Sequence, residues 1–389
     1  MFEPHRVLLR IVCACLLIGT LSAGLWPFHA PRNAVTWLND GGLSIGEYGT
    51  VVSANALKHA DSGEYGPCSL EIWLKPTAAN NHGTVVAFFR PDNFVVSFTV
   101  RQSLADLELR RGALTRHPPG TARVYADDVF SSEQSVFFTI TSSFGGTNIY
   151  SDGKLLRQLP DFKLSVQDFS GRLMIGNAPG LGDNWSGEIR GLAIYSRQLS
   201  ADDVVKQYRT WVHSNSNAFA GNRDAFALYR FKEGGGGVAH NQIETSADLQ
   251  IPGRFFILHQ QFLELPWDEF YAGWSYWANL ALNVIAFFPL GFFFCALFWP
   301  MTIIERRLLA IISLGFAVSL TIEVLQAFLP TRKSGVTDLL TNTLGTALGA
   351  ISFSYAPLND WRARLVRYWM VFRGPVTQGR PKTNIRTQS

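Results

Sequence analysis

Three apolar segments in the last third of the chain constrain its fold more than any other feature. They cover residues 276–299, 308–329 and 337–357. The first contains no charged residue, the second contains Glu323, and the third has Asp338 near its start. A helix that crosses a bilayer needs about 20 predominantly apolar residues. We therefore interpret the three segments as transmembrane helices rather than as helices of a soluble core.

The overall composition indicates that the chain combines a membrane part with a soluble part. Of the 389 residues, 47% are hydrophobic and 16% are charged, whereas a soluble globular protein carries about 25% charged residues. The basic residues gather beside the apolar segments, at Arg6, Arg10, Arg306, Arg307 and in residues 358–389. This distribution is typical of a membrane-topology signal. It is not the basic surface of a nucleic-acid-binding protein, so we expect no nucleic-acid partner.

The N-terminal residues 1–28 admit two interpretations. Arg6 and Arg10 precede an apolar run from Ile11 to Trp26. Small residues at positions 22–24 would suit a cleaved signal peptide, and the apolar run would equally suit a retained transmembrane helix. The positive-inside rule favours a cytoplasmic N-terminus and a cytoplasmic basic tail, residues 358–389. The sequence thus predicts a multi-pass protein of the cytoplasmic (inner) membrane, with residues 31–250 periplasmic or extracellular.

Residues 31–250 have the pattern of an all-β domain. Short runs of alternating apolar and polar residues are separated by Gly, Asn, Asp and Pro. This alternation predicts an antiparallel β-sandwich or jelly roll. Asp152-Gly153 predicts a hairpin turn, and Ser200 predicts the start of a helix that extends to about Trp211. Residues 251–273 form the predicted connector to the membrane part.

Three motifs in this region carry a family resemblance. The runs SLEIWLKP at residues 69–76, TNIYSDGKLL at 147–156 and RLMIGN from Arg172, continued by NWSGEIRGLAIYSRQLSADDVVKQY, occur in that order. Together they resemble the concanavalin A-like, laminin G-type family over about residues 45–210. The resemblance implies a jelly roll of two sheets. Such domains bind glycans or proteins, sometimes with Ca²⁺, or serve as spacers.

The β region also offers candidate ligand contacts. The ring of Trp185 could stack on a sugar, because aromatic faces suit such contacts. Asp183, Asn184 and Asp152 could supply oxygen ligands to calcium, which requires several convergent oxygens. The simpler interpretation is that these three are turn residues. We predict no other cofactor: Cys13, Cys15 and Cys295 lie in apolar segments and Cys68 is alone in the β region, so the cysteines do not supply the clustered ligands of a metal site.

Polar residues recur within the apolar segments at helical spacing. Residues three or four apart share one face of a helix, and the candidate polar cluster comprises Asn283, Glu323, Gln326, Arg332, Asp338 and Asn342. At 1.5 Å per residue, these side chains all fall near the outer ends of their helices. A charge at that depth needs a partner. We expect Arg332 to pair with Glu323, because a guanidinium matches a carboxylate in a bidentate geometry.

Two further features predict how these helices pack. Thr341, Gly345 and Gly349 repeat every four residues, and such small residues let helix backbones approach closely in lipid. Pro289 removes a backbone hydrogen bond and predicts a kink in the first apolar segment. We therefore expect residues 274–357 to form a compact domain of three helices.

The polar and small residues together are similar to the VanZ-like membrane family. The matching motifs are N-x-x-x-F-x-P-L-G at residues 283–291, E-x-x-Q at 323–326, Arg332, and D-x-x-x-N-x-x-G-x-x-x-G at 338–349. The resemblance implies an additional span ahead of this core, which favours retention of residues 1–28 as a helix. It also implies a link to glycopeptide (teicoplanin) tolerance. Family members often carry an Asp-Lys…His feature before the Asn motif, and this chain has WSYWAN at 274–279 instead.

Three functions are compatible with these residues. The first is a cell-envelope protein whose laminin G-type module binds envelope glycan or protein, while its helices contact membrane lipids. The second is a membrane enzyme or a site for lipid headgroups, with Glu323 or Asp338 as acid or base and Arg332 holding an anion. The third is a transporter component. The sequence leaves the oligomeric state, the ligand and the existence of a catalysed reaction open.

Overall fold

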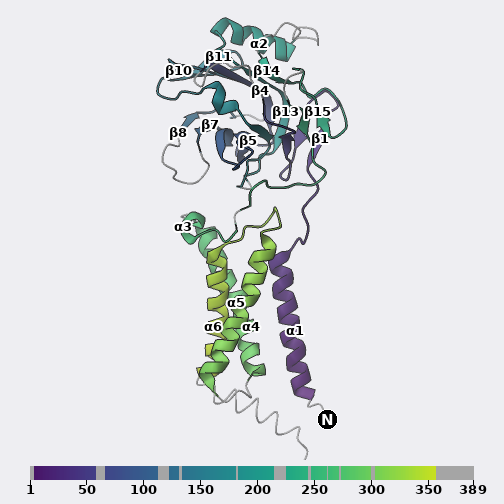
Figure 1. The fold of residues 1–389 in the computed structure, drawn as a ribbon, viewed down its shortest axis with the longest axis vertical. Coiled ribbons are helices and arrows are strands. Elements are labelled where there is room, and N and C mark those ends of the chain that lie inside the picture. The colour runs from purple at the N-terminus through teal and green to yellow at the C-terminus, as the bar shows by residue number, and fades with distance from the viewer. Residues whose placement is uncertain are drawn as a thin grey trace, which may run out of the picture. The chain divides into compact units, whose positions relative to one another are not determined.

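The computed structural model describes residues 4–57, 66–112, 122–130, 134–180, 183–213, 225–243, 247–260, 262–270, 273–298 and 303–355. The chain divides into two compact units (Figure 1). The helical unit comes from residues 1–24, 271–322 and 336–389, and the β unit from residues 25–270 and 323–335. The predicted basic tail, residues 358–389, lies outside the described residues.

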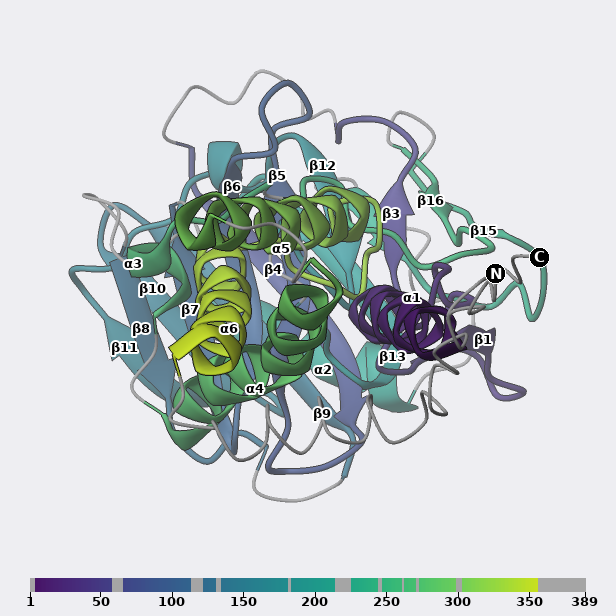
Figure 2. The same cartoon turned by 90° about the horizontal axis from the view of Figure 1, so that it is seen from below.

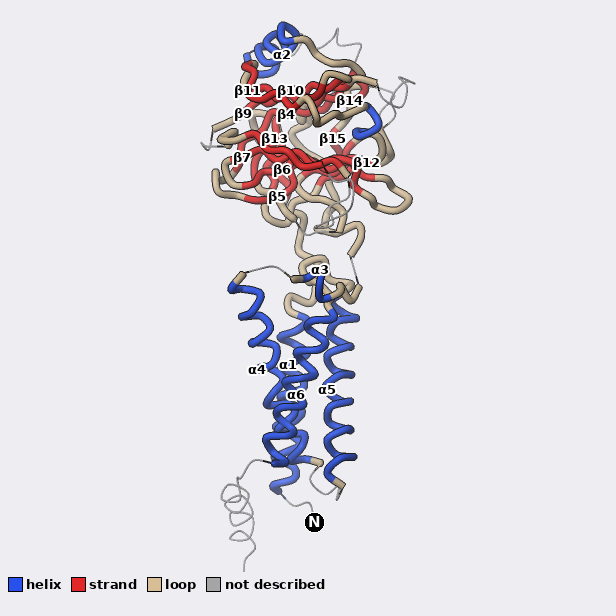
Figure 3. The backbone as a smooth tube through the Cα atoms, turned by 90° about the vertical axis from the view of Figure 1, so that its left-hand side faces the viewer, coloured by secondary structure: helices blue, strands red, loops and turns tan. Residues whose placement is uncertain are grey.

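Two antiparallel sheets build the β unit (Figure 3). The first has the order β1-β2-β13-β4-β9-β10-β11, with β14 paired to β13, and the second has the order β15-β16-β3-β12-β5-β6-β7-β8. The strands of the first sheet are β1 (Val35–Trp37), β2 (Leu43–Ile45), β4 (Cys68–Pro76), β9 (Val136–Ser143), β10 (Gly146–Ser151), β11 (Lys154–Leu159), β13 (Gly187–Tyr195) and β14 (Ala225–Tyr229). Those of the second are β3 (Val51–Ser53), β5 (His82–Phe89), β6 (Val96–Ser103), β7 (Asp106–Arg111), β8 (Ala122–Ala126), β12 (Arg172–Ile175), β15 (Val238–Ala239) and β16 (Leu249–Gln250).

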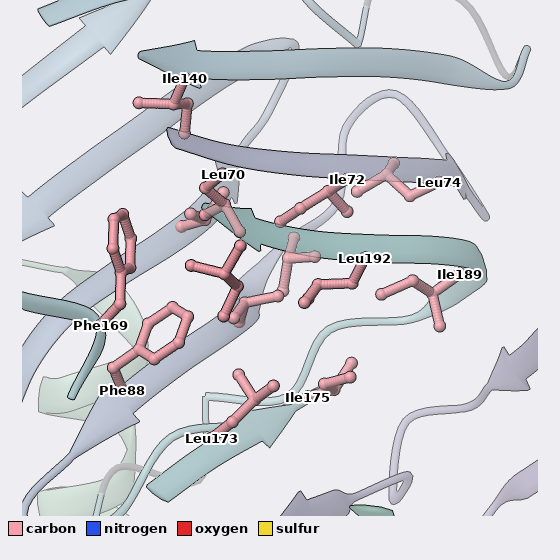
Figure 4. Close-up of a cluster of buried hydrophobic side chains, with 14 of the residues drawn as sticks. Leu70, Ile72, Leu74, Phe88, Ile140, Phe169, Leu173, Ile175, Ile189 and Leu192 are labelled. Carbon is pink, nitrogen blue, oxygen red and sulfur yellow. The ribbon is translucent and has the colours of Figure 1, made fainter. Parts of the chain in front are cut away.

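The core of the β unit lies between the two sheets. Alternate residues of β4, among them Leu70 and Ile72, point toward Phe88 of β5 (Figure 4). Phe88 also meets Phe169 of the short 3₁₀ helix η1 (Val166–Phe169), edge to face, with ring centroids 5.1 Å apart. All four side chains are fully buried. The alternation of the sequence thus produces the apolar faces that a sandwich needs, and the predicted jelly-roll-like fold is confirmed.

Local turn and cap residues act as the sequence predicts. In the hairpin between β10 and β11, Asp152 has φ +49° and Gly153 has φ +80°, as a type I′ turn requires. Helix α2 (Ala201–His213) follows Ser200, whose hydroxyl accepts a hydrogen bond from the amide of Asp203 at 3.2 Å. The carboxylate of Asp203 accepts one from the Ser200 amide in return, also at 3.2 Å. This reciprocal pair is a capping box.

The helical unit contains four long helices (Figure 2) in the part of the chain that the structure describes: α1 (Pro4–Leu25), α4 (Trp274–Leu297), α5 (Ile304–Gln326) and α6 (Val336–Tyr355). The short helix α3 (Pro266–Glu269) belongs to the β unit, as does the last turn of α5. Among the described residues, three helices are long and apolar enough to cross a membrane, namely residues 7–25 of α1, α4 and α5. Helix α6 is richer in Thr, Ser and Asn, so a fourth span stays a prediction. Helix α4 continues through Pro289.

Helices α4 and α6 approach each other closely through their glycines. A Cβ atom added to Gly345 would meet the carbonyl oxygen of Val284, and one added to Gly349 would meet the carbonyl oxygen of Phe288. On the α4 side, Gly291 lies equally close to the backbone of Thr346. Glycine at these positions removes the side chain that would otherwise separate the two backbones. The spacing of Gly345 and Gly349 thus places both on the α6 face that contacts α4.

Candidate functional site

Asn283 and Asp338 form the best-defined polar pair of the helical unit. The side-chain amide of Asn283 in α4 donates a hydrogen bond to Asp338 Oδ1 at 2.7 Å, and a longer one to Thr341 Oγ1 at 3.4 Å. Asp338 and Thr341 lie in the first two turns of α6. Because lipid offers no alternative donor, such a bond ties α4 to α6. The structure therefore brings together three of the residues that the sequence singled out.

Asn342 makes a second contact, from α6 to α5. Its amide nitrogen donates to Ser319 Oγ at 3.0 Å, and both side chains are buried. Its amide oxygen has no hydrogen-bond partner among the described residues. Gln326, at the end of α5, is also buried. The amide nitrogens of Asn283 and Asn342 thus both donate to a neighbouring helix, as polar side chains at helix interfaces in lipid do.

Glu323 and Arg332 have backbone partners. The carboxylate of Glu323 is 1% exposed and accepts a hydrogen bond from the amide of Gly335 at 2.8 Å. The guanidinium of Arg332 donates twice to the carbonyl oxygen of Trp26, at 2.8 and 2.6 Å. We expected Arg332 to bind Glu323, and the structure places its guanidinium on a backbone carbonyl instead. A carbonyl just past the end of a helix is a strong acceptor, because no amide of that helix reaches it.

Gln260 is a contact residue that the sequence reasoning missed. Its side-chain amide donates to the carbonyl oxygens of Gln326 at 3.0 Å and Leu329 at 2.9 Å, and also to that of Arg332. Gln326 is the last residue of α5, so Gln260 adds a side-chain donor to carbonyls at the end of this helix and in the turn after it. The amides of Leu329 and Arg332 also donate to the carbonyls of Gln326 and Leu329, respectively. The two partners are separated by more than 60 positions in the sequence, and no local pattern marks such a long-range cap.

Trp185 does not provide a surface for sugar stacking. Its side chain is 0% exposed, and its indole nitrogen donates to Gln102 Oε1 at 2.8 Å. A Cβ atom on Gly187 would collide with its ring. The expected stacking role is therefore corrected, because Trp185 belongs to the core between the sheets. Trp185 lies two residues before β13 (Gly187–Tyr195), outside any strand, so alternation along a strand could not indicate whether it is buried.

The proposed calcium ligands do not converge. Asp152 lies in the β10–β11 turn, where its carboxylate accepts a hydrogen bond from the Phe137 amide at 3.0 Å. Asp183 forms an ion pair with Arg101 and accepts a hydrogen bond from Thr84 Oγ1 at 3.2 Å. Asn184 forms an isolated bridge with Thr84. Among the described residues, no group of three or more His, Cys, Asp or Glu is arranged to hold a metal ion.

Glu71, in β4, is a buried carboxylate beneath α2. Its Oε2 accepts hydrogen bonds from Tyr195 Oη at 2.7 Å and from Trp211 Nε1 at 3.0 Å, and the side chain is 0% exposed. Burial raises the pKa of Glu71 to about 7, although the hydrogen bonds from Tyr195 and Trp211 oppose the rise. Because Trp211 is in α2 and Tyr195 in β13, this carboxylate fastens the helix to the sheet.

An open pocket lies between the edge strands of the two sheets. It has a volume of about 510 Å³ and is lined by Asp106, Arg123, Val124, Tyr125, Asp127 and Arg157. Strand β8 ends the second sheet and β11 ends the first. Arg157 of β11 donates to the carbonyl oxygen of Tyr125 in β8, so it bridges the two edges. Its guanidinium also lies 3.8 Å from the carboxylate of Asp127.

Buried charges position Arg123 at this pocket. Glu108 is 3% exposed. Its carboxylate forms ion pairs with three arginines: Arg110 at 2.8 Å, Arg123 at 2.9 Å and Arg101 at 3.3 Å. The side chain of Arg123 remains 45% exposed, and its Nη1 donates to Tyr125 Oη at 3.2 Å. A guanidinium fixed through its Nε keeps other N–H groups available to a ligand. The sequence reasoning missed this pocket because its residues come from separate strands.

The comparisons with known proteins agree with this architecture. The family model VanZ/LLP1 matches residues 226–357. The model of the concanavalin A-like lectin/glucanases superfamily matches residues 46–205. No curated protein matches the chain.

Several solved structures overlap loosely with the chain. The receptor-binding domain of botulinum neurotoxin D is 17% identical, with 48% of each chain covered and a TM-score of 0.36. The receptor-binding domain of the botulinum neurotoxin C/D mosaic serotype is 15% identical, with 47% of this chain and 46% of that chain covered and a TM-score of 0.35. The match thus spans about half the length of these structures. The chain therefore joins a two-sheet, concanavalin A-like domain to a VanZ-like region, and three of its described helices are long and apolar enough to cross a membrane.

Proposed function

We propose that this chain is a glycan-binding protein of a bacterial cell envelope, anchored in the cytoplasmic membrane with its β unit on the outer side. The observation that carries the proposal is the pocket between β8 and β11. It is an open, polar depression of about 510 Å³ at the sheet edges. The VanZ-like region supplies the membrane tether, and the β unit supplies the binding surface.

The chemistry of the pocket suits a neutral saccharide. Two arginines offer N–H donors and two aspartates offer acceptors, so the lining carries balanced charge. A sugar hydroxyl both donates and accepts, and it can therefore bond to either kind of group. Tyr125 adds an aromatic ring with a polar end. A polyanion would instead require an excess of positive charge, which this lining does not have.

The polar residues of the helical unit support a packing role over catalysis or transport. Asn283 donates to Asp338, and Asn342 donates to Ser319, so the amide nitrogens of both side chains bond to a neighbouring helix. In lipid, hydrogen bonds of this kind hold helices together. We therefore assign ligand binding to the β unit and anchoring to the helices.

Arg157→Ala tests the pocket. The full chain in phospholipid nanodiscs would be titrated with neutral hexose and N-acetylhexosamine oligomers. Hydrogen bonds from a charged group are worth about 1.5–3 kcal/mol, so the variant should bind roughly 10- to 100-fold more weakly. Lys154→Ala is the matched control, because Lys154 is an exposed residue at the start of the same strand and is not part of the pocket lining.

Two outcomes would contradict the proposal. One is that the unmodified chain binds none of these saccharides. The other is that Arg157→Ala and Lys154→Ala bind equally well, which would place the ligand elsewhere on the β unit. Retained thermal stability of Arg157→Ala separates a lost contact from a lost fold.

A further inference from the structure

The segment of residues 262–270 exposes an unusual set of large apolar side chains. Trp267 is 71% exposed, Phe262 54%, Phe270 46% and Leu265 43%. Four such residues within nine positions form an apolar patch of the kind that marks a contact with a partner or a membrane. We propose that this segment is an interfacial anchor, whose aromatic side chains insert between the headgroups and acyl chains of the bilayer.

The first reason is that the segment is covalently close to a membrane span. Phe270 precedes Trp274, the first residue of α4, by four positions. An extended chain covers at most about 3.6 Å per residue, so the two Cα atoms are at most roughly 14 Å apart. Helix α4 is one of the helices long and apolar enough to cross a membrane. The end of the segment at Phe270 therefore lies within reach of the bilayer surface where α4 enters.

The second reason is that hydrogen bonds fasten the other end of the segment near a second span. The amides of Leu263 and Glu264 donate to Ser334, to its hydroxyl at 3.3 Å and its carbonyl at 2.9 Å respectively. Just before the segment, the side chain of Gln260 donates hydrogen bonds to the carbonyls of Gln326 and Leu329. Because α5 ends at Gln326, these bonds hold the start of the segment at the C-terminal end of a helix that is long and apolar enough to cross a membrane.

The third reason concerns which lipid chemistry fits. No Lys or Arg occurs from residue 255 to residue 305, whereas the segment carries Glu264, Asp268 and Glu269. Basic residues are what draw a peripheral segment to anionic lipid. Trp and other amphipathic aromatics instead prefer the interface itself. The anchor should therefore insert into a zwitterionic bilayer without any need for anionic lipid.

Site-directed fluorescence tests the anchor in the full chain. Trp267→Cys would be labelled with an environment-sensitive nitrobenzoxadiazole probe, in a background where the exposed Cys15 is replaced by Ser. The remaining cysteines, Cys13, Cys68 and Cys295, are buried. The matched control is Phe144→Cys, because Phe144 is 78% exposed in the turn between β9 and β10, far in sequence from any span. Both proteins would be reconstituted in phosphatidylcholine vesicles.

We expect the probe at position 267 to be quenched by a spin label attached near the lipid headgroup and to be several-fold less accessible to aqueous iodide than the probe at position 144. Adding phosphatidylglycerol should change neither result. Iodide access at 267 equal to that at 144 would overturn the proposal. Protection from both quenchers would also overturn it, because the side chain would then be covered by protein. A requirement for phosphatidylglycerol would overturn the assigned lipid chemistry.

Discussion

The β unit and the helical unit use different forces to hold their elements together. In the β unit, large side chains such as Phe88, Phe98 and Phe169 fill the space between the sheets and are fully buried. In the helical unit, the contact between α4 and α6 depends on the absence of side chains at Gly291, Gly345 and Gly349. Polar bonds such as Asn283 to Asp338 add to that contact.

The difference follows from the solvent around each unit. Water drives apolar surface into a core at roughly 25 cal/mol per Å². Lipid provides no such force between helices, because its chains are as apolar as leucine. A large residue therefore stabilises the β unit by filling space, whereas a small residue stabilises the helical unit by allowing close approach. Changes of side-chain volume should act in opposite directions in the two units.

The largest expected effect is from Phe88→Ala in the β unit. Removing a fully buried ring leaves a cavity and should destabilise this unit by about 3–5 kcal/mol. Thermal unfolding of the full chain in detergent, followed by tryptophan fluorescence, would measure the loss. Phe144→Ala is the control, since Phe144 is 78% exposed. Equal melting temperatures for the two variants would contradict the description of this core.

Glu71 should give the β unit a pH-dependent stability. Its pKa is about 7 in the folded protein, above the ordinary value of 4.5. Between pH 4.5 and pH 7 the folded state therefore keeps a proton on Glu71 that the unfolded chain has released. The stabilisation is fully present below pH 4.5 and is lost as the pH rises through 7, with a size on the order of 3 kcal/mol.

Glu71→Gln removes this titration, so the fall in melting temperature between pH 5 and pH 8 should become smaller in the variant. Glu188→Gln, at a partly exposed carboxylate paired with Arg190, is the control and should keep the slope of the unmodified chain. A slope that is the same in all three proteins would remove Glu71 as its source.

Gly345→Val tests whether a larger side chain destabilises the contact between α4 and α6 in the helical unit. The added Cβ would lie 2.9 Å from the Cα of Val284, so α4 and α6 would have to separate. Overpacking of this kind costs about 1–3 kcal/mol. Leu348→Val, at a residue of α6 that is 41% exposed, changes a side chain without adding a Cβ atom and serves as the control. Resistance to thermal aggregation in detergent should fall for Gly345→Val alone, and an equal fall in both would contradict the close approach.

The elements of the fold were predictable where the signal is local. Alternation along β4, the Asp152-Gly153 turn and the cap at Ser200 each arise from a few neighbouring residues, and the structure has a strand, a turn and a helix there. The spacing of Gly345 and Gly349 likewise places both on one face of α6. Such patterns follow from the periodicity of the backbone, so one sequence is enough to see them.

The candidate sites were harder to predict because they depend on distant residues. The pocket combines β7, β8 and β11, and the cap of α5 comes from Gln260. Trp185 was expected at a ligand but is buried, because it lies in the segment before β13, where no strand periodicity indicates the direction of a side chain. Arg332 binds the Trp26 carbonyl rather than Glu323, because a backbone acceptor left free at a helix end competes with a carboxylate.

The order of the elements has a consequence for synthesis. Helix α1 packs with α4 and α5 through residues such as Cys13 and Leu17, yet the entire β unit up to residue 270 is translated before either partner exists. At about 5–20 residues per second, the ribosome needs roughly 12–50 s to reach α4. During that delay α1 exists without the helices it packs against, and its uncharged run from Ile11 to Trp26 has the composition of a helix that is stable alone in lipid.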